Sequence, residues 1–325
     1  MSKFIRTILI FFSPSVLLLA WYLTDDPFLL YRQTDNLYEC GQRKQCVNDA
    51  YRAIRLMNQY DDSMHYNSFI IGSSRSDFYY VEEWKKYLNK DASCFHFNQS
   101  GDNLLGTLQR TKYLYKRFKK IDNMLFIIDA EWLEDIGPHK GHLFRQPWQV
   151  TDEWDFFTFN WECIRAFYTI EYQKQVWGIT PQEKKLPFSF IAEYNEVQKV
   201  GAEELLASNP EAYYETLTGF YRLYERTYTD SVSSPVIGTR QRVALENLHK
   251  MLINGDTDYR IVISPLYNQI ALNPQDLMGL KEIFGEDKVY DFSGENEYTN
   301  DITNYYETSH YRPKLCNIIL KQLYD

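Results

Sequence analysis

Basic side chains are in the minority in this sequence of 325 residues, which has 35 Lys and Arg against 44 Asp and Glu and a net charge of −9 at pH 7. No basic run interrupts that balance. Because nucleic-acid binding needs concentrated positive charge, we expect no nucleic-acid partner.

Cysteine is also scarce, with five residues and no Cys-x-x-Cys or paired-histidine spacing. This absence argues against a zinc site, and we expect no cofactor. Cys40 and Cys46 are close enough in sequence to close a small loop, which an oxidising compartment would permit as a disulfide. Cys94 and Cys316 lie in apolar segments and are expected to be buried.

The sequence has no internal repeats and no low-complexity segment, but aromatic residues make up 17% of it, with 27 Tyr, 20 Phe and 7 Trp. Most of these side chains are expected to fill a core. Tyr and Trp also form the stacking walls of carbohydrate sites, so part of the surplus is compatible with a glycan ligand.

An apolar run at residues 7–23 carries no charge and ends with Trp21 and Tyr22. Its length and closing aromatics predict a transmembrane helix. Lys3 and Arg6 precede the run and acidic residues follow it, which places the N-terminus in the cytoplasm and the main domain outside, in the periplasm or at the cell surface. No small-residue cleavage site follows, so residues 1–25 are predicted to be an uncleaved signal anchor.

Apolar strands alternate with helices over much of the remaining chain. Strands are expected at residues 69–71, 94–97, 124–128, 259–263 and 288–291, and helices at 77–88, 104–119, 239–253, 274–284 and 312–323. This alternation predicts an α/β domain, a doubly wound five-stranded parallel sheet with helices on both faces.

The alternation is interrupted at residues 130–235, which are rich in Trp, Tyr, Phe and Glu. We expect a mainly helical insertion there, with helices at 155–177 and 210–228 and no clear strand. Residues 26–62 are predicted to be a juxtamembrane stem with a helix at 46–60, and residues 63–325 the main domain.

The first strand ends at Gly72-Ser73-Ser74, directly before a predicted helix. A strand, a tight turn and a helix place a hydroxyl at the carboxyl edge of the sheet, where backbone N–H groups favour negative charge. Ser74 is therefore a candidate nucleophile, while Ser76 is expected to cap the following helix.

A nucleophilic serine needs a base, and the segment before the last helix offers one. His310 stands there with Glu307 three residues upstream. One turn brings the carboxylate back onto the imidazole and leaves the other ring nitrogen to face Ser74. The alternative is that Ser74 and His310 only cap helices.

These residues resemble blocks of the SGNH/GDSL hydrolase superfamily. Gly72-Ser73-Ser74 is similar to its first block, Gly101 in an Asn/Ser-rich loop to its second, and the acidic-x-x-His segment to its fifth. The resemblance is to the membrane-anchored bacterial branch that acts in D-alanylation of teichoic acids and acetylation of exported polysaccharides. It implies a flavodoxin-like SGNH fold, with Ser74 as nucleophile, His310 as base and Glu307 as its orienting acid.

The same resemblance assigns the N–H groups of Ser74 and Gly101 to an oxyanion hole. The third block of the family contains an asparagine, whereas Asp129-Ala130-Glu131 stands there in this chain. The side-chain donor must then come from elsewhere, and Asn98, Asn103 and Asn268 are the candidates. Arg75 is either an anion contact or a salt-bridging residue.

The hypothesis is therefore a membrane-anchored SGNH-like serine esterase or O-acyltransferase, acting on an acylated cell-surface or exported glycan. A polysaccharide-synthesis protein in the membrane would be a natural partner. One alternative is an inactive, membrane-tethered module that binds a glycan or a synthase through Trp148, Trp154 or Trp161. A more distant one is metal-dependent hydrolysis through Asp129, Glu131 and His139, with a metal pair at His139 and His142.

Overall fold

The computed structural model describes residues 3–32, 47–179, 186–226 and 231–325, apart from the side chains at positions 3–6, 8, 9 and 220. Cys40 and Cys46, whose disulfide the sequence allows, lie outside the described residues. The other three cysteines, Cys94, Cys163 and Cys316, are free and buried.

A five-stranded, all-parallel sheet forms the centre of the fold, with strand order β2-β1-β3-β6-β7. This confirms the predicted five-stranded parallel sheet. The strands are β1 (Ser68–Gly72), β2 (Cys94–His96), β3 (Asn123–Ile128), β6 (Asp258–Ile263) and β7 (Val289–Asp291). Because all strands run in one direction, their carboxyl ends meet at one edge, where parallel α/β sheets bind ligands.

Successive residues of each strand point to opposite faces, and the side chains divide between two cores accordingly. Phe69 and Ile71 belong to one core and Ile70, between them, to the other. Every residue of β1 and β3 is buried, as expected for strands covered on both faces.

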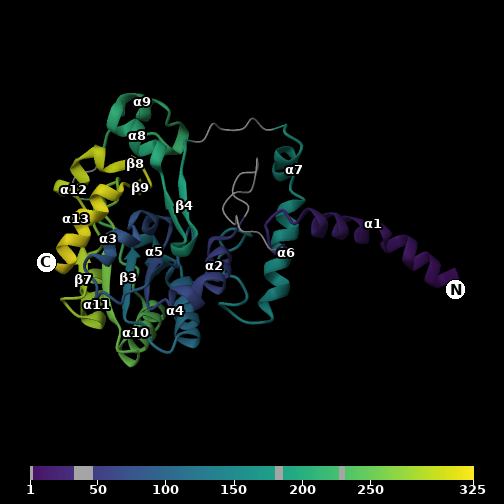
Figure 1. Ribbon diagram of the computed structural model, residues 1–325, viewed down its shortest axis with the longest axis horizontal. Helices are drawn as coiled ribbons and strands as arrows, with labels where there is room; N and C mark the ends of the chain where they lie inside the picture. The colour runs from purple at the N-terminus through teal and green to yellow at the C-terminus, as the bar shows by residue number, and fades with distance from the viewer. Residues whose placement is uncertain (1–2, 33–46, 180–185, 227–230) are drawn as a thin grey trace.

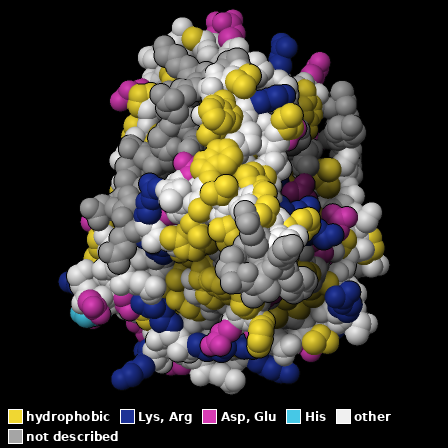
Figure 2. All heavy atoms as spheres, turned by 90° about the vertical axis from the view of Figure 1, so that its right-hand side faces the viewer, with side chains coloured by type: hydrophobic (Ala, Val, Ile, Leu, Met, Phe, Trp, Pro, Cys, Tyr) yellow, Lys and Arg dark blue, Asp and Glu magenta, His cyan; other side chains and the backbone are white. Residues whose placement is uncertain are grey.

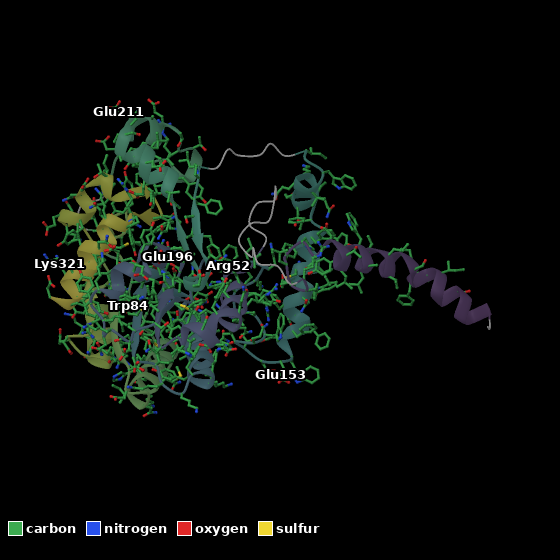
Figure 3. All side chains as sticks on the ribbon, in the orientation of Figure 1. Arg52, Trp84, Glu153, Glu196, Glu211 and Lys321 are labelled. Atoms are coloured by element: carbon green, nitrogen blue, oxygen red, sulfur yellow. The ribbon has the colours of Figure 1, made fainter. Side chains whose placement is uncertain are left out.

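Helices cover both faces, and Figure 1 shows α13 and α4 on opposite sides of the sheet. Side chains of α2, α4, α10 and α11 contribute to the first core, and those of α3 and α13 to the second. Trp84 of α3 lies within the body, whereas Glu211 and Lys321 lie at its edge (Figure 3). The bounds are α2 (Asp49–Met64), α3 (Val81–Lys85), α4 (Leu104–Arg117), α10 (Thr239–Asn254), α11 (Pro274–Phe284), α12 (Glu297–Asn300) and α13 (Pro313–Tyr324).

The predicted helix at 77–88 is wrong in extent. The chain forms a 3-10 helix, η1 (Ser74–Phe78), and then the short helix α3. Tyr79 departs from helical geometry with φ −83° and ψ 86°. The first turn of α3 is held by a distant residue, because the Val81 N–H donates to Glu196 Oε2 at 2.6 Å.

The insertion is built mainly of short helices, but the expectation of no strand is also wrong. Strands β4 (Ser189–Ile191) and β5 (Glu196–Gln198) form an antiparallel hairpin. The expected helix at 155–177 is divided at Thr169, whose side chain accepts from the Tyr172 N–H and so begins a second helix. The helices are α5 (Ala130–Glu134), α6 (Asp155–Phe167), α7 (Ile170–Val176), α8 (Val200–Ser208) and α9 (Pro210–Glu215).

The N-terminal apolar run lies in helix α1 (Lys3–Asp25), which projects away from the body in Figure 1. Trp21 at its base packs edge-on against Phe167 of α6, with ring centroids 5.2 Å apart. Among the residues that the structure describes, no helix combines the length and the apolar character needed to cross a membrane.

Candidate active site

The turn after β1 presents Ser74 at the carboxyl edge of the sheet. Gly72 is required there, because a Cβ atom would lie 2.7 Å from the Ile127 carbonyl oxygen. Ser73 caps η1, with its hydroxyl accepting from the Arg75 N–H. Ser76 is not the predicted cap, since it lies inside η1 and donates to the Ser73 carbonyl at 2.7 Å.

His310 reaches Ser74 from a small antiparallel hairpin that precedes α13. Its strands are β8 (Tyr305–Glu307) and β9 (His310–Tyr311), and Glu307 lies opposite His310. His310 Nε2 is 2.8 Å from Ser74 Oγ, while His310 Nδ1 is hydrogen-bonded to Glu307 Oε1. The structure therefore brings together the three residues that the sequence pointed to, although 236 positions separate the serine from the histidine.

The Glu307 carboxylate is held at both oxygens. Its Oε2 accepts from the Ser309 N–H at 2.6 Å, so Oε1 is directed at the imidazole. The tautomer with a proton on Nδ1 satisfies this contact and leaves Nε2 as a lone-pair acceptor for the Ser74 hydroxyl. This is the orientation that general-base catalysis needs.

The proton affinities of the pair agree with this arrangement. Burial lowers the pKa of His310, and Glu307 opposes that effect only in part, so the net pKa lies below its ordinary value. Burial raises the pKa of Glu307, but the hydrogen bond and charge of His310, the Ser309 N–H and the charge of Lys199 together outweigh it, so the net pKa is lowered. At neutral pH the pair is therefore a neutral imidazole beside a carboxylate.

Two backbone N–H groups are available for an oxyanion. Those of Ser74 and Gly101 donate to no acceptor among the described residues. Gly101 adopts φ +61°, a left-handed conformation that favours glycine, and the Phe144 ring lies 3.1 Å from where its Cβ would be. A residue with a side chain at position 101 would therefore be strained.

The three candidate asparagines differ in the hydrogen bonds that their side chains make. Asn103 caps α4 through the Gly106 N–H and donates to the Gly137 carbonyl, so it supports the fold. Asn98 donates to Asp77 Oδ1 and accepts from Asn195. Asn268 accepts from the Ile270 N–H at 3.1 Å and lines a cavity of about 660 Å³. Asn103 also lines a cavity, but one of only about 40 Å³, so of these three asparagines Asn268 faces the larger space.

Arg75 is a salt-bridging residue. Its guanidinium lies 2.5 Å from Asp129 and 3.1 Å from Glu131, measured between the nearest nitrogen and oxygen atoms. Asp129 also caps α5 through the Trp132 N–H. Asp129 thus has two structural partners at the position where the resembling family places an asparagine.

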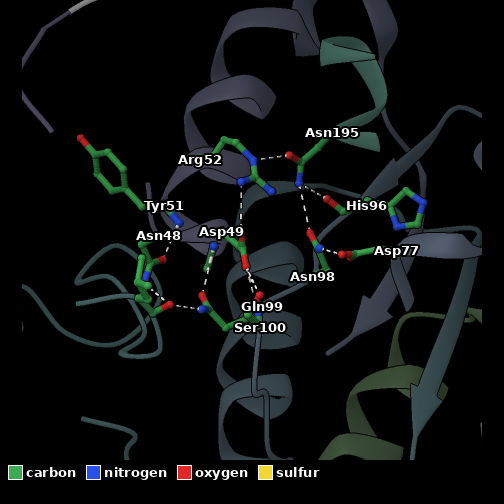
Figure 4. Close-up of polar contacts among 12 residues, drawn as sticks. Asn48, Asp49, Tyr51, Arg52, Asp77, His96, Asn98, Gln99, Ser100 and Asn195 are labelled. Carbon is green, nitrogen blue, oxygen red and sulfur yellow. Dashed lines mark hydrogen bonds and ion pairs between the residues drawn. The ribbon is translucent and has the colours of Figure 1, made fainter. Parts of the chain in front are cut away.

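A polar network fixes the loop that carries Gly101, and Figure 4 shows it. Asp49 Oδ2 in the first turn of α2 accepts from both the N–H and the hydroxyl of Ser100, at 3.0 and 2.5 Å. Gln99 Oε1 accepts from the Ala50 N–H at 3.0 Å. Arg52 holds Asp49 and also donates to Asn195 of the insertion. This support could not be predicted from the sequence, because Asp49 and Ser100 belong to segments with no shared pattern.

A cavity of about 660 Å³ opens at the carboxyl ends of β3 and β6. Asp129 and Glu131, which pair with Arg75 of the turn after β1, lie in its wall. Hydroxyl and amide groups supply much of the rest, and aliphatic side chains complete it. These are Tyr224, Ser231, Ser233, Ser234, Ser264, Asn268 and Ser293, with Ile263, Leu266, Ile270 and Leu272.

The metal-site alternative is wrong for the part of the chain described. No group of three or more His, Cys, Asp or Glu residues within it could hold a metal ion. His142 packs against the Phe28 ring at 4.5 Å between centroids, and burial lowers its pKa to about 4. Its role is therefore in packing.

Compared with models of known protein families and with curated protein sequences, the chain matches none.

Proposed function

We propose that this protein is a serine-dependent esterase or O-acyltransferase. The observation that carries the proposal is the contact of 2.8 Å between Ser74 Oγ and His310 Nε2, with Glu307 bound to the other ring nitrogen. A serine with a base that is itself oriented by a carboxylate is the arrangement of an activated nucleophile. A serine and a histidine that only cap helices would not need Glu307 on Nδ1.

The proposed reaction begins when Ser74 Oγ attacks an ester carbonyl and its proton passes to His310 Nε2. Glu307 stabilises the imidazolium that forms. The N–H groups of Ser74 and Gly101 would stabilise the oxyanion. His310 then protonates the leaving alcohol, which departs as the acyl–Ser74 ester forms. Water or an acceptor hydroxyl next attacks this ester, giving hydrolysis or transfer.

An O-acylated glycan is the proposed substrate class. The cavity whose wall includes Asp129 and Glu131, the ion partners of Arg75, is lined by five serine hydroxyls, a tyrosine and an asparagine, which suit a ligand rich in hydroxyl groups. The charged side chains among the described residues of its wall are Asp129, Glu131 and Glu134, all acidic, so the wall favours a neutral or cationic ligand over an anionic one.

We infer that the chain is related to the SGNH/GDSL hydrolases. The sheet order, the serine after β1, the glycine in the loop after β2 and the acidic-x-x-His segment before the last helix support this inference. The Arg75–Asp129 ion pair is a departure from that family's third block.

We further propose that α1 anchors the chain in a membrane, with the main domain on the extracytoplasmic side. Apolar side chains on all sides of α1 are exposed, such as Phe11 at 76% and Leu17 at 69%. Trp154, Phe157 and Trp161 on α6 are exposed as well, and Figure 2 shows apolar side chains gathered on the face from which α1 projects. A flotation assay with liposomes tests this: the full chain should float, and a variant with Leu17→Lys and Phe11→Lys should not.

The same exposed tryptophans support a second candidate function, that of an inactive, membrane-tethered module that binds a glycan or a synthase. Trp154 and Trp161 project outward, whereas Trp148 packs against Tyr51 and Phe159 and is part of the fold. The module predicts loss of function in Trp154→Ser with Trp161→Ser but none in Ser74→Ala. The enzyme predicts the reverse.

Labelling of the full chain with a fluorophosphonate probe tests the enzyme proposal. The wild-type protein should be labelled, while Ser74→Ala and His310→Ala should lose the label. Ser309→Ala is a matched control, since its backbone N–H, which binds Glu307, is retained. A correctly folded wild-type protein that takes up no label, hydrolyses no simple aryl ester and transfers no acyl group would overturn the proposal.

A further inference from the structure

A single lysine from the insertion lies beside the candidate triad. Lys199, between β5 and α8, places its ammonium group over two aromatic rings, 4.9 Å from the centroid of Phe78 and 4.7 Å from that of Tyr306. The Phe78 ring packs edge-on against the imidazole of His310, with centroids 5.7 Å apart. The Phe78 ring thus contacts both the ammonium group and the imidazole.

The position of this lysine is unusual in its surroundings. It is partly buried, and within the described part of the chain no carboxylate lies within 4.0 Å of its ammonium group. Its charge is held by the faces of the two rings, which attract cations. Because no carboxylate is in direct contact with the ammonium group, its positive charge is less cancelled and has a stronger electrostatic effect on ionisable groups nearby.

The charged groups near Lys199 and His310 come from three elements. Glu307 of β8 and Asp77 of η1 attract the ammonium group of Lys199. His310 faces Glu307, Lys199 and Arg75, and the charge of Arg75 is largely compensated by Asp129 and Glu131. Among the described residues near the imidazole, Lys199 is therefore the cation with no carboxylate within salt-bridge distance.

We propose that Lys199 is a positioning residue of the triad, whose ammonium group favours the ionised carboxylate of Glu307 and the neutral imidazole of His310 in the resting enzyme. This inference rests on the proposed function in one respect, which is that His310 acts as the general base. The repulsion between Lys199 and a protonated His310 agrees with the lowered pKa of the imidazole, which burial causes first and Lys199 reinforces. The base would thus remain ready to accept the Ser74 proton in mildly acidic surroundings.

The direct test is an NMR titration of the histidine side chains in the full-length protein, with the His310 signal assigned from its absence in His310→Asn. We expect Lys199→Met to raise the pKa of His310 by roughly 0.5 to 1 unit, because a like charge several ångströms away is removed. Lys199→Arg should retain the wild-type value. Lys288→Met is the matched control, since Lys288 also lies over an aromatic ring, 5.6 Å from the centroid of Tyr259, but far from the triad in the fold.

A kinetic readout connects this shift to reactivity. In Lys199→Met the acid limb of fluorophosphonate labelling should move upward by the same amount as the NMR value, which lowers labelling on that limb by at most about three- to tenfold, while labelling at pH 9 stays within twofold of wild type. A wild-type protein that takes up no label overturns the proposed function but leaves the NMR test intact. A His310 pKa that shifts by less than 0.2 unit in Lys199→Met, or equally in Lys199→Arg, overturns the role of Lys199.

Discussion

Replacing Glu307 by glutamine removes the charge that orients His310 and keeps nearly the same shape. One oxygen of Glu307 bonds to His310 Nδ1, and the other accepts from the Ser309 N–H at 2.6 Å. Both contacts need an acceptor, but an amide has only one acceptor oxygen. If the NH2 group faces His310, the ring must carry its proton on Nε2 and cannot accept from Ser74. If it faces Ser309, two donors oppose each other at hydrogen-bond distance.

The size of the effect follows from the charge. Glu307 is buried and stabilises an imidazolium that exists only after the proton transfer. Removing one partner of a buried charged pair costs about 3–5 kcal/mol. If that loss falls on the transition state, the labelling rate of Ser74 decreases by roughly 10²- to 10⁴-fold.

The assay is the second-order rate constant for fluorophosphonate labelling at pH 8, with circular dichroism and thermal unfolding to show that the variant is folded. Glu307→Asp is the control, because it retains the charge but shortens the arm by one methylene. We expect it to lose about tenfold, clearly less than Glu307→Gln. A folded Glu307→Gln protein that labels within threefold of wild type would refute the role of Glu307.

Three further predictions concern pH and stability. Because the pKa of His310 lies below 6.5, wild-type labelling should rise with pH, with a midpoint below 6.5, and then level off; a midpoint above 7 would contradict the pKa argument. Arg110 of α4 donates to both carboxylate oxygens of Asp102, at 2.8 and 2.5 Å, and both side chains are buried. Arg110→Met should therefore lower the free energy of unfolding in urea by about 3–5 kcal/mol, since the Asp102 carboxylate would remain buried without its cation; a loss below 1 kcal/mol would show that water replaces the guanidinium. Burial raises the pKa of Asp77 to about 7, well above its unfolded value, so its carboxylate should weaken the fold progressively as pH rises from about 4 to about 7. Asp77→Asn removes that titration and should gain roughly 2 kcal/mol relative to wild type between pH 5 and pH 8 in urea unfolding; a pH-independent difference would argue against it.

The sheet was predictable because its strands are short apolar runs buried on both faces, a pattern set by local sequence. The candidate triad could be found because Gly72 and Glu307 each stand within three residues of the group that they position. The break at Tyr79 was not visible, since the cap of α3 comes from Glu196, 115 positions away. The cap at Thr169 is local, and a threonine at that position is itself a sequence signal for the start of a second helix.

Lys199 and Asp49 were missed for a different reason. Neither belongs to a motif. Lys199 comes near the candidate triad only because the insertion packs against the carboxyl edge of the sheet, and Asp49 contacts Ser100 only because α2 packs there. Asp129 was visible in the sequence as the residue after the third strand, but its partner was not, because a salt bridge between Arg75 and Asp129 depends on how β1 and β3 align.

The hydrogen bonds between α2 and the loop at Ser100 have a consequence for slow motion. The Ala50 N–H is bonded to Gln99, and the Ser100 N–H to Asp49, so each segment supplies the acceptor for an amide of the other. Opening either one exposes both amides to solvent. In hydrogen–deuterium exchange the two should therefore lose protection together, as one cooperative unit. Anything that pulls on α2 from the side of α1 would then also release the glycine that the oxyanion is proposed to require.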